Sequence, residues 1–136
     1  MDLIRVGIVD GVNEQEGTIR VIFPDYDDMV VDDIALLSFE QRFPNVDESV
    51  VCIFLPNGTQ QGFCLGPYFN DQNSLPIKQK NMYVKKIDEG LEFMYDYTTK
   101  KLSISAQNGI SINGDVSVNG SVSINGSLTV NGISVP

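Results

Sequence analysis

Residues 109–132 read GISING DVSVNG SVSING SLTVNG, and this stretch decides how the chain folds. Each of the four hexads ends in Asn-Gly, and a Ser or Thr separates its two aliphatic residues at the second and fourth positions. Alternation with a period of two predicts very short β-strands, and Asn and Gly accept the positive φ of a sharp corner. We expect a corner every six residues, at Asn113 and Gly114, Asn119 and Gly120, Asn125 and Gly126, and Asn131 and Gly132.

The aliphatic positions of the hexads are predicted to form the core of a rod. They are Ile110, Ile112, Val116, Val118, Val122, Ile124, Leu128 and Val130. One copy alone would leave an apolar face in water and two strand edges unpaired, and four hexads are little more than one coil of a hexapeptide β-helix. We therefore expect several copies, most naturally three, to share a closed β-prism whose strands pair between chains. The alternative is a disordered Gly/Ser/Asn tail, but such tails lack phased aliphatic residues.

The end of the repeat differs from the rest. Ile133 arrives one residue early, so the phase of the aliphatic positions changes after the fourth hexad. Ile133, Val135 and Pro136 predict an apex closed by apolar packing. Residues 107–136 contain a single charge, Asp115, which suits a rod with an outer face of Ser, Thr and Asn.

The remaining chain of this 136-residue protein has room for one small domain. The N-terminus, MDLIRVGIVDG, lacks the basic region of a signal peptide, and no apolar run approaches the ~20 residues of a membrane span. We expect a soluble product of the bacterial cytoplasm that leaves the cell only as part of a larger assembly. Cys52 and Cys64 lie in apolar runs and are expected to be buried thiols, because a disulfide would need one hairpin register that the sequence does not fix.

The charge of the protein argues against a nucleic-acid partner. The formal net charge is −9, and residues 1–71 hold 13 acidic and 3 basic side chains. Nucleic-acid affinity comes largely from Lys and Arg that neutralise phosphates. Asp25, Asp27, Asp28, Asp32 and Asp33 could be read as a calcium loop, but they lack the glycine and terminal glutamate of an EF-hand. A solvated acidic rim is the commoner explanation.

Residues 1–70 predict a small closed barrel. Five short strands are expected at 3–12, 18–23, 29–39 (with a break at Asp32 and Asp33), 50–56 (buried on both faces) and 62–69, with Gly- and Pro-rich turns between them. Their apolar set is Ile4, Val6, Ile8, Val21, Phe23, Val51, Ile53, Phe54, Leu55, Phe63 and Leu65. Residues 71–80 form a polar linker. Residues 81–106 predict three more strands, a β collar between the barrel and the needle of residues 107–136.

The order of these segments resembles the phage baseplate assembly protein V family. The resemblance covers essentially the whole chain and rests on RVGIV and GTIRVIFPD, VVCIFLPNG and GFCLGPYFN, DEGLEFMYD and KLSIS, and INGDVSVNG. Members are the central spikes of contractile phage tails and related bacteriocins. The resemblance implies an all-β fold with an N-terminal OB-type barrel followed by an intertwined trimeric β-helix needle. It also implies a spike that closes the tail tube, seats on a separate trimeric tail-hub protein and punctures the target envelope on sheath contraction.

One departure from the family concerns metal. Its spikes can carry a His-x-His pair with which three chains bind an iron ion near the apex, and this sequence contains no His. We therefore expect no transition metal at the tip of the needle and no cofactor.

Two other classes of function compete with the spike. A hexapeptide-repeat acyltransferase shares the six-residue period, but such enzymes use a histidine base that this chain lacks, so we expect no enzyme. An OB-type module that binds oligonucleotides or glycans is disfavoured by the acidic charge and by the absence of Trp.

Overall fold

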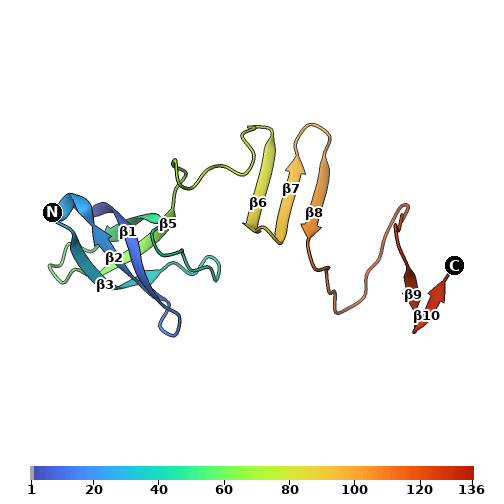
Figure 1. Ribbon diagram of the computed structural model, residues 1–136, viewed down its shortest axis with the longest axis horizontal. Coiled ribbons are helices and arrows are strands. Elements are labelled where there is room, and N and C mark those ends of the chain that lie inside the picture. The colour runs from blue at the N-terminus through green and yellow to red at the C-terminus, as the bar shows by residue number, and fades with distance from the viewer. Residues whose placement is uncertain (1) are drawn as a thin grey trace. The chain divides into compact units, whose positions relative to one another are not determined.

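The computed structural model describes residues 2–136, and these residues form an all-β structure (Figure 1). The strands are β1 (Ile4–Asn13), β2 (Thr18–Phe23), β3 (Met29–Leu36), β4 (Ser49–Phe54), β5 (Gly62–Pro67), β6 (Met82–Asp88), β7 (Leu91–Asp96), β8 (Lys101–Ala106), β9 (Leu128–Val130) and β10 (Ile133–Val135). A short 3-10 helix, η1 (Pro24–Tyr26), follows β2. The chain divides into two compact units, Met1–Lys80 and Asn81–Pro136.

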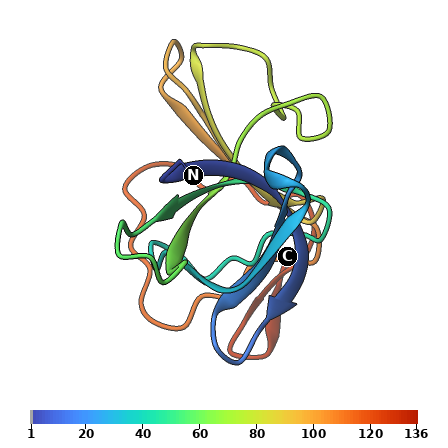
Figure 2. The same cartoon turned by 90° about the vertical axis from the view of Figure 1, so that its left-hand side faces the viewer.

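The first unit is a closed barrel with the strand order β1-β2-β3-β5-β4 (Figure 2). All neighbouring strands are antiparallel except β3 and β5, which pair in parallel over only two positions, Ala35 with Phe63 and Leu36 with Cys64. Closure gives each of the five described strands a neighbour on both sides, although the contact between β3 and β5 is short. The closed five-stranded barrel confirms the all-β prediction and is consistent with an OB-type barrel.

Two phenylalanines occupy the centre of the barrel. Phe23 and Phe54 pack edge to face with their ring centroids 5.6 Å apart, the arrangement that aromatic quadrupoles favour. The buried core consists of Val9, Ile19, Val21, Phe23, Val31, Ile34, Val50, Cys52, Phe54 and Cys64. All of these residues lie on β1 to β5, so the barrel has a core that is independent of the second unit.

Two members of the apolar set expected for the barrel, Ile4 and Val6 of β1, do not belong to its core. Arg5, Gly7 and Val9 face the interior, whereas Ile4 and Val6 are exposed. Val21 and the large Phe23 ring leave no space for a side chain at position 7. A Cβ there would lie 2.3 Å from Val21 Cγ1 and 2.9 Å from Phe23 Cδ1. Because the interior has room only for a glycine at this point, Ile4 and Val6 lie on the outer face of β1.

Arg5 fills the interior position nearest the start of β1. It is 6% exposed, and its guanidinium carbon lies 3.9 Å from the centroid of the Phe54 ring. Its Nε donates to the backbone carbonyl of Asp2 at 2.7 Å, and its Nη1 donates to Gln60 Oε1 at 3.1 Å. Stacking and these hydrogen bonds explain how a buried cation is accommodated among aromatic rings.

Strand β4 is buried on one face, which corrects the prediction of burial on both. Val50, Cys52 and Phe54 point inward, whereas Ile53 and Leu55 are exposed. The all-apolar sequence concealed this alternation. Leu65 of β5 is exposed as well. Of the predicted apolar set, only Val21, Phe23 and Phe54 are fully buried inside the barrel.

Strand β3 also differs from its prediction, because it ends at Leu36 and not at residue 39. The expected break at Asp32 and Asp33 is a β-bulge within a continuous strand: the register against β2 shifts there, and Asp33 has a φ of 57°. Bulges of this kind increase the local twist and help to close a small barrel.

The second unit contains a three-stranded antiparallel sheet, a repeat segment and a hairpin. The sheet has the order β6-β7-β8, at the positions where the three collar strands were predicted. The hairpin β9–β10 joins its strands through Asn131 and Gly132, both with positive φ. Positive φ at both central residues is typical of a type I′ turn.

Candidate oligomerisation surface

The first three hexads each have a backbone bend at their final glycine. Gly114, Gly120 and Gly126 have φ values of 140°, 138° and 135°, in a region that L-residues with side chains rarely adopt. The preceding Asn113, Asn119 and Asn125 do not have positive φ, so glycine alone makes these three corners. A near-identical corner every six residues repeats the same local conformation along the segment.

Between the corners the first three hexads form no strand in the single chain, although very short strands were expected there. Strand β8 ends at Ala106 and β9 begins at Leu128, and within the described residues 2–136 the intervening hexads pair with no other strand. Backbone N–H and C=O groups in β structure normally pair along a ladder. This segment therefore presents unpaired backbone donors and acceptors together with its side chains.

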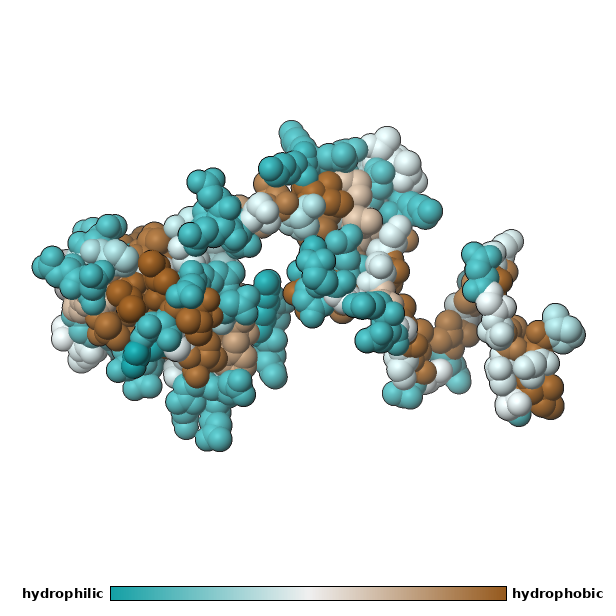
Figure 3. Space-filling model, in the orientation of Figure 1, coloured by the Kyte–Doolittle hydropathy of each residue, from teal (hydrophilic) through white to brown (hydrophobic). Residues whose placement is uncertain are grey.

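The eight aliphatic residues of the hexads are all exposed in a single chain. Their exposed fractions lie between 40% and 66% for Ile110, Ile112, Val116, Val118, Val122, Ile124, Leu128 and Val130. Brown apolar side chains are visible along this C-terminal segment in Figure 3. An unbroken series of exposed aliphatic residues is unusual on a soluble surface and is typical of an interface.

The fourth hexad differs from the first three. It forms strand β9, and its Asn131–Gly132 turn folds Ile133 and Val135 back beside Val130 and Leu128. Ile133 and Val135 remain 71% and 44% exposed. The predicted apex residues are thus held in a hairpin, and their apolar side chains are still uncovered in one chain.

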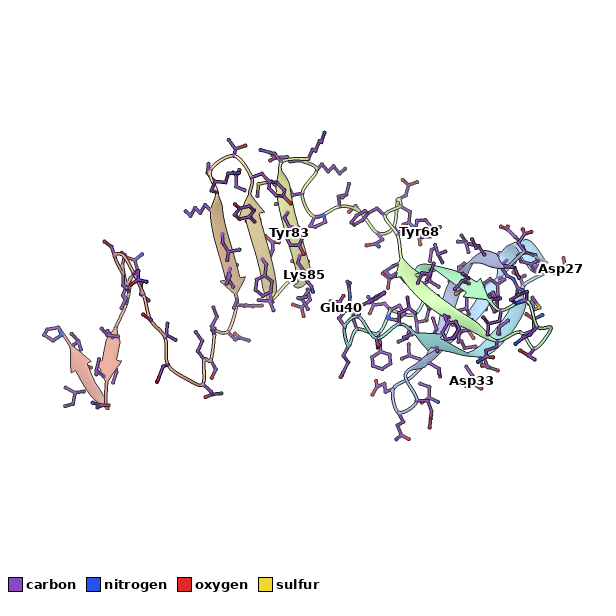
Figure 4. The ribbon with its side chains drawn as sticks, turned by 180° about the vertical axis from the view of Figure 1, so that it is seen from behind. Asp27, Asp33, Glu40, Tyr68, Tyr83 and Lys85 are labelled. Atoms are coloured by element: carbon purple, nitrogen blue, oxygen red, sulfur yellow. The ribbon has the colours of Figure 1, made fainter. Side chains whose placement is uncertain are left out.

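One face of the β6–β8 sheet is mainly apolar, with Lys85 as its one charged member. Directly paired residues of neighbouring strands point to the same face, and three such rows can be read from the register. The rows are Tyr83–Tyr95–Leu102, Lys85–Phe93–Ile104 and Leu91–Ala106. Figure 4 labels Tyr83 and Lys85, the members contributed by β6. We call these eight residues the collar face; Leu102 and Ile104 on it are largely exposed.

A groove of about 900 Å³ connects the collar face with the first hexad. Its apolar lining comprises Ile87, Leu91, Phe93, Ile104, Ala106 and Ile110. Because Ile110 is the first aliphatic residue of the repeat, the apolar surface of the sheet continues directly into the hexads. The two features form one surface within the second unit.

Charged groups of this unit lie at the edge of the groove. Lys86 Nζ of β6 pairs at 3.0 Å with Glu89 Oε1 in the turn that follows, and this hydrogen bond raises the pKa of Lys86. Asp88 Oδ1 accepts a hydrogen bond from the Gly90 backbone N–H at 2.7 Å and fixes the same turn. The turn therefore satisfies its own polar groups locally.

The barrel carries a second apolar surface on its outside, which Figure 3 shows as a brown patch on that unit. Ile4 pairs with Ile53 and Val6 with Val51 across β1 and β4, and Ile53 pairs with Phe63 of β5. Paired residues share a face, so these side chains form one outer wall. The wall contains Ile4, Val6 and Ile53, the outward-facing residues of β1 and β4 described above.

The acidic residues considered as a calcium loop lie at the surface of the barrel. Asp25, Asp27 and Asp28 are in or directly after η1, and Asp32 and Asp33 are in the β3 bulge (Figure 4 labels Asp27 and Asp33). All five are exposed, and no group of three or more His, Cys, Asp or Glu side chains in residues 2–136 is placed to hold a metal ion. Asp32 lies 3.9 Å from Arg20, which also pairs with Asp10. The hydrogen bond to Asp10 raises the pKa of Arg20.

Comparison with known proteins adds no relative: no protein-family model and no curated protein matches the chain. Within the described residues, no helix is long and apolar enough to cross a membrane.

The collar face is the part of this surface that sequence reasoning missed. The signal was present on β8, because Leu102, Ile104 and Ala106 alternate with Ser103 and Ser105. On β7, Leu91, Phe93 and Tyr95 recur at every second position, but Met94 between them weakens the alternation. Period-two alternation marks a face, but a single sequence does not tell whether a strand's apolar face is covered by its own chain.

Proposed function

We propose that this chain forms the homotrimeric central spike of a contractile tail, from a phage or a headless bacteriocin. In this role it closes the tip of the tail tube and punctures the target envelope when the sheath contracts. The proposal rests on the resemblance of the sequence to the baseplate assembly protein V family. The structural observation that supports it most is the repeat itself, with exposed aliphatic side chains and unpaired backbone over the same residues.

A trimer would both bury the exposed aliphatic side chains and pair the unpaired backbone groups. Each copy supplies one side of a prism, the aliphatic residues fill the axis, and the backbone of one chain pairs with that of the next. The Ser and Thr residues between the aliphatic positions then face water. The collar face and its groove supply the start of the same shared core, since they are continuous with Ile110.

The proposed role is mechanical and needs neither a catalytic residue nor a cofactor. A rod with a dry aliphatic axis and a dense hydrogen-bond ladder resists bending and compression. Regular glycine corners keep the three chains in step, because each corner repeats the same backbone geometry. The hairpin β9–β10 forms the tip of the needle, where three copies of Ile133, Val135 and Pro136 close the apex.

The barrel is proposed to seat on a separate trimeric tail-hub protein through its polar and acidic loops. Its exposed acidic residues in η1 and the β3 bulge form one such set. The outer wall around Ile4 and Ile53 offers an apolar surface for a neighbouring protein in the same assembly.

A genetic experiment tests the proposed function. Contractile particles produced without this chain should lose killing activity, and the full chain supplied in trans should restore it. A chain ending at Ala106 is the informative comparison, because it retains the barrel and the collar but lacks the needle. Particles that kill normally without the chain, or that are rescued fully by the shortened one, would refute the spike function.

A further inference from the structure

The two cysteines of the chain face each other inside the barrel. Cys52 of β4 is paired directly with Cys64 of β5, and their side chains are 0% and 2% exposed. Both thiols are free. The structure therefore supplies the hairpin register that the sequence alone left open.

One backbone hydrogen bond shows whether Cys52 and Cys64 form a hydrogen-bonded or a non-hydrogen-bonded pair of the β4–β5 ladder. The backbone N–H of Leu55 donates to the carbonyl of Gln61 at 2.9 Å, which makes Leu55 and Gln61 a hydrogen-bonded pair of the antiparallel ladder. Hydrogen-bonded and non-hydrogen-bonded pairs alternate along such a ladder. Counting back through Phe54 and Ile53, the pair Cys52–Cys64 belongs to the non-hydrogen-bonded class.

That class brings two residues closest together. Non-hydrogen-bonded partners have Cα atoms ~4.5 Å apart, which falls inside the ~4.4–6.8 Å range of protein disulfides. The interaction with the neighbouring Cys64 thiol, together with burial, raises the pKa of Cys52. Both groups thus lie within reach of one bond, and the closed barrel keeps Cys52 as a neutral thiol.

We propose that Cys52 and Cys64 form a redox site, in which a low-molecular-weight disulfide such as oxidised glutathione converts them into a cross-strand disulfide. Both thiols are buried in the folded barrel, so the reaction runs through transient opening of the barrel. In the open form one cysteine thiolate attacks the small disulfide, forms a mixed disulfide and releases one glutathione thiolate. The second cysteine thiolate attacks the protein sulfur of the mixed disulfide and releases the second glutathione. The two cysteines lose two electrons and two protons in total, and the small disulfide is reduced to two thiols.

The two cysteines lie beside the shortest strand pairing of the barrel, the one between β3 and β5. Strand β5 pairs with β3 at two positions only, so its ladder with β4 carries most of its attachment. A bond between Cys52 and Cys64 closes a short loop in the unfolded chain, for which the loop-entropy relation gives a rise of about 100-fold in the folding equilibrium constant. By the same thermodynamic cycle, folding favours the disulfide by the same factor.

The experiment compares oxidation of the full chain in native buffer and in concentrated urea. The protein is equilibrated with mixtures of reduced and oxidised glutathione, quenched in acid, alkylated and weighed by mass spectrometry. We expect native protein to reach half oxidation at a ratio [GSH]²/[GSSG] about 100-fold higher than unfolded protein. The product should be an intramolecular bond that links the Cys52 and Cys64 peptides.

Three outcomes would overturn the proposal: equal midpoints in the two conditions, a lower midpoint for native protein, or only mixed and intermolecular disulfides. The variants Cys52→Ala and Cys64→Ala serve as matched controls and should yield mixed disulfides with glutathione, only after unfolding in urea. If either variant fails to fold, the comparison of native and unfolded wild-type protein still decides between the outcomes.

Discussion

Replacement of Val118 by aspartate tests the inward assignment of the hexad side chains. Val118 is 57% exposed in a single chain. Burial of a whole valine side chain is worth ~1.5–3 kcal/mol, so covering its exposed half contributes ~1 kcal/mol per chain and ~3 kcal/mol per layer of three chains. Val118→Asp loses this contribution and places three carboxylates around one axial position.

The carboxylates add a larger cost. Each is removed from water without a cationic partner, and each repels the other two, so they must either take up protons or keep the layer open. We expect a total loss of at least ~5 kcal/mol per trimer, which weakens assembly by more than ~1,000-fold. Light scattering over a range of protein concentrations would detect it as dissociation of the complex.

The matched control is Ser117→Asp, one residue before Val118 in the same hexad, where the proposed prism makes the chain extended. Successive residues of an extended chain point to opposite sides, so this carboxylate should face water and leave assembly unchanged. The two positions are both exposed in a single chain, and local effects on the monomer are therefore alike. Similar damage from both substitutions would refute the assignment of the second and fourth hexad positions to the axis.

Three further predictions concern the barrel and its independence from the needle. Gly7→Ala should destabilise the barrel by ~1–3 kcal/mol, because the new Cβ would clash with Val21 and Phe23, whereas Gly11→Ala, with its nearest neighbour 3.8 Å away, should change the calorimetric unfolding temperature little. Arg5→Lys should lower the free energy of unfolding by ~1–2 kcal/mol, because lysine has no planar guanidinium to stack on Phe54 while it bonds Asp2 and Gln60. The loss would appear as a lower urea midpoint of unfolding, and an unchanged midpoint would mean that the stacking is unimportant. A chain ending at Ala106 should keep the barrel's β-type circular dichroism but assemble far more weakly, and a tight trimer of undiminished stability would place assembly in the barrel or the collar face.

The hexad corners were the most predictable feature, because their cause is local. Gly114, Gly120 and Gly126 have positive φ, which glycine adopts without a steric cost, and the sequence repeats this residue every six positions. The fourth corner has the same letters but a different geometry, since Asn131 joins Gly132 in positive φ and makes a hairpin. Only the Ile133 that follows, one residue early, distinguishes it in the sequence.

The inner face of the barrel was less predictable, because it depends on residues far apart in the chain. Hydrophobicity placed Ile4 and Val6 inside, but Phe23 already occupies the space beside β1 and admits only Gly7 there. Arg5 is buried because the Phe54 ring offers it a face to stack on. Neither fact can be read from β1 alone, and an all-apolar strand such as β4 carries no alternation to reveal its faces.

The molar mass of the full chain in solution tests the trimer most directly. Light scattering coupled to size exclusion, at micromolar concentration, should give three times the 15.0 kDa of one chain, or about 45 kDa. That mass is expected because the hexads and the collar face leave their aliphatic residues uncovered in one copy. A stable monomer of 15.0 kDa would contradict the shared core and, with it, the proposed spike.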